Sequence, residues 1–279
     1  MPKGKKKRRR RKRERSVRAP LGRRLELYQK SVQAPEVDVE FFSRLFLEHS
    51  GREAVALRED FCGSALLAAE WVRSDAGRRA LGVDFHLPTL AWGSGQAMET
   101  LGRRGRERLS LVCANVLDVA GPPADVACAL NFSFCALKTR DLLERYFRVV
   151  HQALAEDGVF FCELYGGTEA IVEIEEKREV DDFTFVWHQS SFNPIDRETL
   201  CHIHFELADG RRIERAFTYD WRLWTIPEVR ELLTAAGFAS TRVYWEQVDD
   251  EGDGTGEYVP TEKEENQEGW LVYIVALKR

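Results

Sequence analysis

The sequence predicts an α/β protein with a doubly wound, mostly parallel seven-stranded sheet whose last strand is antiparallel, and a small antiparallel β insertion after strand 5. Three observations support this fold class. Between residues 55 and 164, short apolar runs alternate with helical patterns, as in parallel sheets covered by helices on both faces. Residues 183–219 instead contain three strand-like runs, the last two joined by a turn at Ala208-Asp209-Gly210. Two final runs have no helix between them, so they must pair antiparallel.

The five parallel strands are expected where apolar residues follow one another without alternation, as in strands buried on both faces: residues 55–57, 79–83, 109–113, 125–130 and 159–164. Helical spacing of apolar residues predicts helices within residues 20–50 and at 65–72 and 140–155. Another helix is expected from Leu87, because Pro88 is tolerated in a first helical turn.

The insertion, residues 165–224, is expected to carry strands at 183–189, 200–207 and 211–219. Thr225-Ile226-Pro227-Glu228 is a capping-box pattern and Gly237 suits a helix C-terminus, so a helix is expected between them. Strands at 241–247 and 270–277 complete the sheet. The segment between them, residues 249–268, is acidic and contains glycine, which predicts a mobile loop.

The charge is divided unequally along the chain. The net charge of −5 combines +10 in the first fifteen residues with −15 in the remainder, because residues 3–15 hold eleven Lys or Arg and one acid, Glu14. Residues 1–19 are therefore expected to form a disordered polybasic tail, and residues 20–279 the folded domain. The tail could bind a polyanion such as RNA, DNA, the ribosome or an anionic membrane, or be solvated without a specific partner.

Several classes of protein are disfavoured by what the sequence lacks. No run of eighteen apolar residues exists, and the basic N-terminus has no apolar segment after it, so neither a transmembrane span nor a secretory signal is expected. The six cysteines form no CxxC pair, as in a cytosolic protein with reduced thiols. His202 and His204 share one face of a strand without a third nearby ligand, so no metal is expected. A cytoplasmic location follows, or a nuclear one if the source is eukaryotic.

Residues 57–67, LREDFCGSALL, contain the pattern that points to a ligand. Two carboxylates, Glu59 and Asp60, follow an apolar run, and a turn of small residues then opens a helix. Such a turn lets the backbone approach a ligand closely. About twenty residues later a second apolar run ends in Asp84, the spacing at which a carboxylate reaches a bound ribose. The sequence therefore predicts a nucleoside-cofactor site.

With these motifs, residues 35–279 resemble the class I S-adenosylmethionine-dependent methyltransferases. The resemblance is carried by residues 59–65, by Gly82-Val83-Asp84, by Asn131-Phe132-Ser133-Phe134 and by residues 225–238. The segments REDFCGSALLAAEW and YDWRLWTIPE resemble sequences of a bacterial-type branch of that family. We attach no substrate to that branch. The resemblance implies S-adenosyl-L-methionine as cofactor and methyl transfer as the reaction.

The resemblance also implies roles for residues on the first two strands. Glu59, with Asp60 as the fallback, would contact the methionine amino group. The backbone around Gly63 would lie against the methionine and the sugar. Asp84 would accept hydrogen bonds from the ribose hydroxyls. The alternative for Glu59 and Asp60 is a capping role at the next helix, and for Asp84 a role at the strand end.

On the third strand, the resemblance places Asn115 near the adenine amino group and Val116 against the ring. The chain also departs from the family pattern. Phe61 stands where the first glycine of the turn is usual, and Ala65 where the last one is. Tyr28 and Gln33, before the first strand, could reach the ligand or pack in the core.

The acceptor side is less specified. Asn131 and Ser133 follow the fourth strand and are expected near the reacting methyl group, where they would position the acceptor. No proline follows Asn131, unlike in the Asn/Asp-Pro-Pro motif of adenine and cytosine amino methyltransferases. The insertion resembles the substrate lid of small-molecule methyltransferases, and its aromatic and polar residues could line a pocket or pack the insertion onto the domain: Tyr219, Trp221, Arg222 and Trp224. Aromatic rings favour a cationic amine, whereas Arg222 could hold a carboxylate.

Three alternative functional interpretations remain open. A Rossmann dehydrogenase requires a GxGxxG turn, but this chain has CGSALL. A binding module without catalysis could use the same fold. An RNA- or ribosome-associated methyltransferase would use the basic tail for recruitment.

Overall fold

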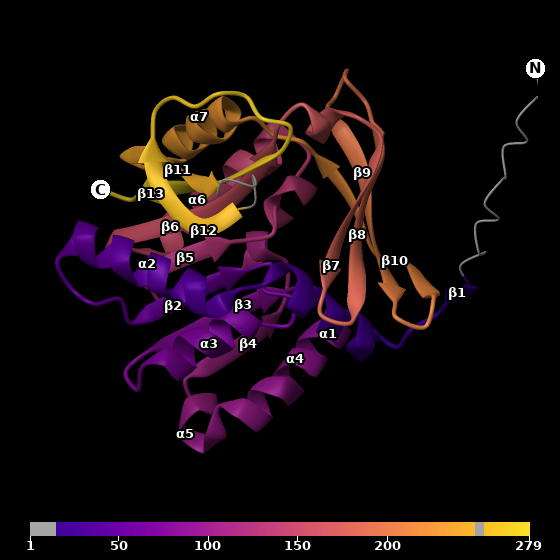
Figure 1. The fold of residues 1–279 in the computed structure, drawn as a ribbon. Helices are drawn as coiled ribbons and strands as arrows, with labels where there is room; N and C mark the ends of the chain where they lie inside the picture. Colours follow the sequence, from indigo (N-terminus) through magenta and orange to yellow (C-terminus); the bar gives the residue numbers. More distant parts are fainter. Residues whose placement is uncertain (1–14, 249–253) are drawn as a thin grey trace, which may run out of the picture.

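The computed structural model describes residues 15–248 and 254–279. Within them the strands form two sheets, a large one with eight strands and a smaller one with five (Figure 1). The eight-stranded sheet has the order β12-β11-β13-β6-β5-β2-β3-β4. No described helix has both the length and the apolarity needed to cross a membrane.

The parallel part of the large sheet confirms the predicted doubly wound architecture. Its strands are β2 (Ala56–Asp60), β3 (Arg79–Asp84), β4 (Leu109–Cys113), β5 (Ala124–Ala129) and β6 (Leu154–Gly166). β13 (Trp270–Leu277) pairs antiparallel with β6 and β11 (Ser240–Val248) pairs antiparallel with β13, as predicted. β2 is longer than expected and includes both of its carboxylates.

Helices cover both faces of this sheet. α2 (Pro35–Ser50), α3 (Leu66–Ser74) and α4 (Leu87–Thr100) pack on one face, and α6 (Arg140–Ala153) and α7 (Ile226–Ala236) on the other. α5 (Gly102–Arg106) and the 3₁₀ turns η1 (Val116–Asp118), η2 (Ser133–Ala136) and η3 (Glu169–Ile171) are short connections. The predicted capping box of α7 is present, and Gly237 ends the helix with a φ of 112°.

The predicted loop at residues 249–268 is wrong in part. Residues 254–261 form β12 (Gly254–Thr261), which pairs antiparallel with β11 as an eighth strand. The centroid of the Tyr258 ring lies 4.7 Å from the Tyr273 ring centroid and 5.5 Å from the Phe41 ring centroid. This aromatic contact anchors a segment whose overall composition is acidic. Residues 249–253 lie outside the described chain.

The insertion forms the small sheet, in the order β1-β10-β9-β8-β7. β8 (Phe183–Phe192), β9 (Glu198–Leu207) and β10 (Arg211–Arg222) are the three predicted strands, and β7 (Ile174–Val180) precedes them. β1 (Arg15–Val17) pairs parallel with residues 211–213 of β10, so the prediction of a disordered tail is wrong for residues 15–17. The rest of the predicted polyanion-binding segment, residues 3–14, lies outside the described residues.

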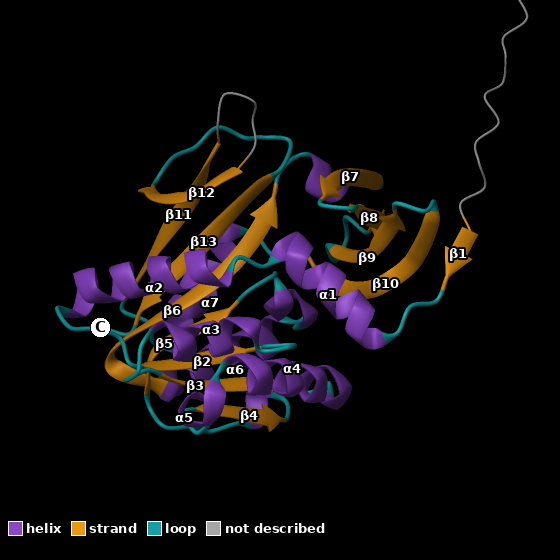
Figure 2. Cartoon of the chain, turned by 60° about the horizontal axis from the view of Figure 1, so that its bottom comes forward, coloured by secondary structure: helices purple, strands orange, loops and turns teal. Residues whose placement is uncertain are grey.

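α1 (Leu21–Val32) lies between the two sheets (Figure 2). Leu27 is fully buried against the small sheet, in a cluster that includes Phe205 and Ile213. Gln29 connects the helix to the large sheet, because its Nε2 donates to Ser64 Oγ at 2.8 Å. The carboxyl ends of the parallel strands therefore face α1 and β10.

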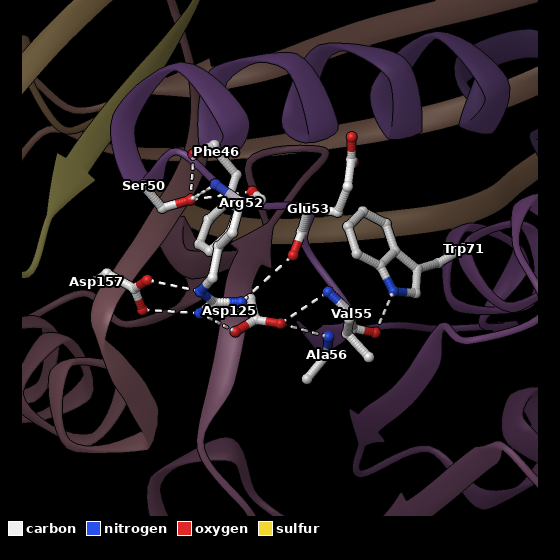
Figure 3. A network of polar contacts seen from close by, with 9 residues as sticks. All are labelled: Phe46, Ser50, Arg52, Glu53, Val55, Ala56, Trp71, Asp125 and Asp157. Atoms are coloured by element: carbon white, nitrogen blue, oxygen red, sulfur yellow. Dashed lines mark hydrogen bonds and ion pairs between the residues drawn. The ribbon is translucent and has the colours of Figure 1, made fainter.

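A polar network fixes the opposite, amino end of the parallel strands (Figure 3). Asp125 accepts the N–H groups of Val55 and Ala56 at 2.7 and 2.8 Å, and the Arg52 guanidinium at 2.6 Å. Arg52 also binds Asp157 through two hydrogen bonds of 2.8 Å. The amino end of β2 is thus tied to β5 through Asp125 and, through Arg52, to Asp157 of β6.

Candidate functional site

A cavity of about 640 Å³ lies between the carboxyl ends of β2, β3 and β5 and a facing wall made by α1 and β10. Crevices at this edge of an open α/β sheet are the usual ligand sites of the fold class. The cavity brings together eight of the predicted cofactor, acceptor and lid residues: Glu59, Asp60, Gly63, Asp84, Asn131, Ser133, Tyr219 and Trp221.

The turn after β2 has left-handed backbone at three positions. Phe61 has a φ of 56°, Gly63 of 53° and Ala65 of 55°. The two non-glycine residues that depart from the family pattern therefore keep the glycine-like conformation, which costs energy. Burial compensates, since the Phe61 ring packs 5.4 Å from Tyr146 and Ala65 is 1% exposed.

α4 packs directly against this turn at Gly93. A side-chain β-carbon added there would lie 2.0 Å from the Ser64 carbonyl oxygen. A β-carbon at Gly63 would instead meet only Thr89 Cγ2, at 4.0 Å. The turn is thus tightly held from the helix side and open toward the cavity.

Asp84 lies at the end of β3, beside the turn. One of its carboxylate oxygens accepts the N–H of Gly63 at 2.9 Å, and the other accepts the N–H of His86 at 2.8 Å. Each oxygen can accept a second hydrogen bond. The side chain is oriented by backbone donors while it still lines the cavity.

Glu59 and Asp60 are both buried at the end of β2. Glu59 Oε2 accepts the N–H of Ala68 at 2.9 Å, which is the capping role considered from the sequence, and Oε1 accepts no hydrogen bond from the described residues. Burial raises the pKa of Glu59 to about 8. Both oxygens of Asp60 have partners, Arg58 Nε at 2.9 Å and the Tyr146 hydroxyl at 3.1 Å. Of these two carboxylates, Glu59 is therefore the one that keeps an oxygen without a partner in the described chain.

The segment after β5 is strained. Asn131 has a φ of 50° and Phe132 of 57°, and the Asn131 N–H donates to the carboxylate of Glu163. The Ser133 hydroxyl donates to Leu130 O at 2.7 Å, so its oxygen remains an acceptor. Left-handed backbone at non-glycine residues thus occurs in the loops after β2 and after β5, which both border the cavity.

Two of the four candidate lid residues line the cavity. The rings of Tyr219 and Trp221 stack with centroids 4.4 Å apart. Arg222 and Trp224 lie elsewhere: Arg222 donates to Glu228 at 2.8 Å and its guanidinium lies 3.8 Å from the Trp224 ring centroid. Trp224 is 2% exposed, so these two side chains pack β10 against α7, the alternative considered from the sequence.

The predicted adenine contacts also lie outside the cavity lining. Asn115 is exposed, and its Oδ1 accepts the N–H of Leu117 at 3.0 Å as the cap of η1. Val116 is 3% exposed and belongs to the core. Phe85 and His86, the two residues after Asp84, line the cavity instead.

α1 contributes residues that sequence reasoning missed or left open. Tyr28 and Gln33 both line the cavity, as does Arg24. The available signal was a helical stripe at spacings of three and four, formed by Leu21, Arg24, Leu25 and Tyr28. The opposite side of the helix packs on the small sheet, so the stripe alone does not say which side meets a ligand.

No protein-family model matches the chain, and no curated protein matches it in sequence. Among solved structures, it is similar to an S-adenosylmethionine-dependent methyltransferase from Clostridium acetobutylicum, with a TM-score of 0.67 and 14% identity over 91% of this chain and 96% of that one. An amino pentose methyltransferase from Micromonospora echinaspora matches with a TM-score of 0.64 and 13% identity over 95% and 100%. A sugar N-methyltransferase from Streptoalloteichus matches with a TM-score of 0.59 and 18% identity over 100% and 99%.

These likenesses extend over nearly the whole of each chain, so they include the small sheet as well as the large one. Because the identities are only 13–18%, these likenesses are evidence for the fold alone. The chain has the fold of the class I S-adenosylmethionine-dependent methyltransferases.

Proposed function

We propose that the protein is an S-adenosylmethionine-dependent methyltransferase that acts on a small-molecule acceptor. The observation that carries the proposal is the composition of the single cavity described above. Its large-sheet wall holds Glu59, the turn around Gly63 and Asp84. Its other end holds Ser133 and the stacked pair Tyr219 and Trp221. A nucleoside cofactor and an acceptor would therefore meet in one cavity.

The residues present fit the cofactor. Gly63 leaves its backbone open to the cavity, and Asp84 can accept further hydrogen bonds, which suits ribose hydroxyls. Glu59 has an unused oxygen, which suits an ammonium group. The cofactor would supply a methyl group on a positively charged sulfur.

Methyl transfer needs alignment more than acid or base chemistry, because positive charge is lost from sulfur as the acceptor attacks. In this chain α1 and β10 cover the strand ends and limit the access of water. Asn131 and Ser133 would position the acceptor from the loop after β5. The Ser133 oxygen can accept a hydrogen bond from an acceptor N–H or O–H.

Two observations favour a small acceptor. The cavity lies between two facing walls, and its volume of about 640 Å³ is typical of small-molecule sites. Two of the similar structures are described as sugar-modifying, an amino pentose methyltransferase and a sugar N-methyltransferase. A polar amine is compatible with the faces of Tyr219 and Trp221.

Isothermal titration calorimetry of the full chain tests the cofactor. We expect one site for S-adenosylmethionine and for S-adenosylhomocysteine, and none for NAD⁺. No binding of either adenosyl compound at millimolar concentration would contradict the proposal. Labelled S-adenosylmethionine, incubated separately with the small-molecule and RNA fractions of a cell extract, then distinguishes the acceptor classes. Label in the RNA fraction alone would favour the tail-recruited alternative, and binding without any transfer would favour a binding module.

A further inference from the structure

Arg24 places a half-buried cation on the α1 side of the cavity. Its Nη1 donates to Ala216 O at 2.8 Å, and its guanidinium carbon lies 5.8 Å from the centroid of the Phe217 ring. Ala216 and Phe217 also line the cavity. Among residues 15–248 and 254–279, no Asp or Glu oxygen lies within 4.0 Å of this guanidinium.

Arg24 is also incompletely hydrogen-bonded. Its Nε is buried and has no hydrogen-bond partner in the described chain. Two other arginines of the protein interior have acidic partners: Arg58 binds Asp60 at 2.9 Å, and Arg222 binds Glu228 at 2.8 Å. A buried donor on a charged group is costly to leave unpaired. The arrangement indicates that Arg24 meets an anion when the cavity is filled.

A second arginine lines the same wall. Arg215 lies in the β-bulge between Ile213 and Phe217, with a φ of 47°. Its backbone N–H donates to His204 Nδ1 at 3.1 Å, which holds the bulge in place. The α1 and β10 wall thus carries two arginines, the half-buried Arg24 and the exposed Arg215, and one acid, Asp220, which already binds Lys138 at 2.5 Å. The other three acids of the cavity lining, Glu59, Asp60 and Asp84, lie on the large-sheet wall.

We propose that this wall binds an oxyanion of the methyl acceptor, a carboxylate or a phosphate, with Arg24 as the residue that determines specificity. The inference rests on the proposed function, because it assigns the acid-lined wall to the cofactor. α1 crosses the turn after β2 at Gln29, which bonds Ser64. Arg24 lies five residues earlier, roughly 7 Å along the helix axis. Arg24 instead bonds Ala216 O of β10, the strand whose Tyr219 and Trp221 line the end of the cavity assigned to the acceptor.

The test is calorimetric titration of the full chain, saturated with S-adenosylhomocysteine, with inorganic phosphate and separately with acetate. We expect at least one of the two to bind the wild type, and Arg24→Gln to weaken that binding by about tenfold or more. The anion affinity of Arg24→Lys, which keeps the charge but not the planar guanidinium, should lie between those of the wild type and Arg24→Gln. The matched control is Arg23→Gln, since Arg23 is exposed and paired with Glu26 at 3.3 Å. It should leave anion binding unchanged.

Three results would overturn the inference. The first is that neither anion binds the wild type at a concentration of roughly 20 mM, about 20 times a millimolar dissociation constant. The second is equal anion binding by the wild type and both Arg24 variants, and the third is a loss of S-adenosylhomocysteine affinity in Arg24→Gln as large as its loss of anion affinity. The last result would assign Arg24 to the cofactor's own carboxylate. If S-adenosylhomocysteine does not bind the wild type, the proposed function fails, and anion titration of the ligand-free chain still decides whether Arg24 forms an anion site.

Discussion

The carboxylate of Asp84 accepts the backbone N–H of Gly63 at 2.9 Å, so the end of β3 holds the turn that follows β2. This hydrogen bond joins two features that are twenty-one residues apart in the sequence. It orients the carboxylate before any ligand arrives, which lowers the cost of binding. The cofactor wall is thus preorganised by the chain itself.

Asp84→Ala is expected to weaken S-adenosylmethionine binding by about 1.5 to 3 kcal/mol, the usual range for a hydrogen bond to a charged group. It should also lower the free energy of unfolding, because the N–H groups of Gly63 and His86 lose their acceptor. Calorimetry and urea unfolding measure the two effects. Asp118→Ala is the control, since Asp118 is exposed and its carboxylate accepts a hydrogen bond from Arg145 at 3.0 Å, outside the cavity. Unchanged affinity in Asp84→Ala would show that the ribose contact lies elsewhere.

Gly93→Ala is expected to disrupt the cavity from the helix side. The added β-carbon would lie 2.0 Å from Ser64 O, so α4 or the turn must move. Overpacking of this kind costs about 1 to 3 kcal/mol of stability, and we expect a parallel loss of S-adenosylmethionine affinity. Gly95→Ala in the same helix meets no atom within 4 Å and should raise stability by about 0.5 to 1 kcal/mol. Equal effects of the two substitutions on binding would contradict the close packing.

The sheet and the cofactor wall could be predicted because their signals are local. Asp84 follows a short apolar strand at a characteristic distance from the turn, and the α7 capping box lies within four residues. The left-handed conformation of Phe61 could not be predicted, because it depends on packing against Tyr146, eighty-five residues away. Local patterns carry information only about neighbours on the same element.

β12 and Arg24 were missed for a related reason. The acidic composition of residues 249–268 hides Tyr258, whose partners Phe41 and Tyr273 come from distant elements. α1 is amphipathic, but one side of it packs on the small sheet and another side faces the cavity. Which side of it meets the ligand is decided only when β10 is in place.

Asp125→Ala is expected to destabilise the protein strongly without changing the cavity. The N–H groups of Val55 and Ala56 would lose their acceptor in a buried environment (Figure 3), at a cost of about 1 to 3 kcal/mol each. Asp157→Ala removes only the half-exposed partner of Arg52, which should cost about 1 kcal/mol or less. Urea unfolding measures both. Similar losses for the two variants would argue that the backbone acceptor role is minor.

Stability is expected to fall as pH rises through the neutral range. Burial raises the pKa of Glu59 from 4.5 to about 8, so between these values the folded state holds a proton that the unfolded state releases. The free energy of unfolding then decreases with pH across that window, by at most about 1.4 kcal/mol per pH unit for this group. Burial also raises the pKa of Glu163 to about 7 and the pKa values of Asp60 and Asp38 to about 6. Glu59→Gln should therefore remove the slope between about pH 7 and pH 8 and reduce it at lower pH; an unchanged slope between pH 7 and pH 8 would assign it to another group.

The same carboxyl group links cofactor binding to proton release. A cationic ligand beside Glu59 favours its ionised form, so S-adenosylmethionine binding below pH 8 is expected to release a proton from this group, whose pKa is raised to about 8 by burial. The affinity should then rise with pH, by at most about tenfold per unit, until the carboxyl group is ionised in the free protein. Calorimetry in two buffers with different ionisation enthalpies counts the released protons. Glu59→Gln should abolish the release, whereas Asp118→Ala should not. Binding of the wild type without proton release would place the ammonium group of the cofactor away from Glu59.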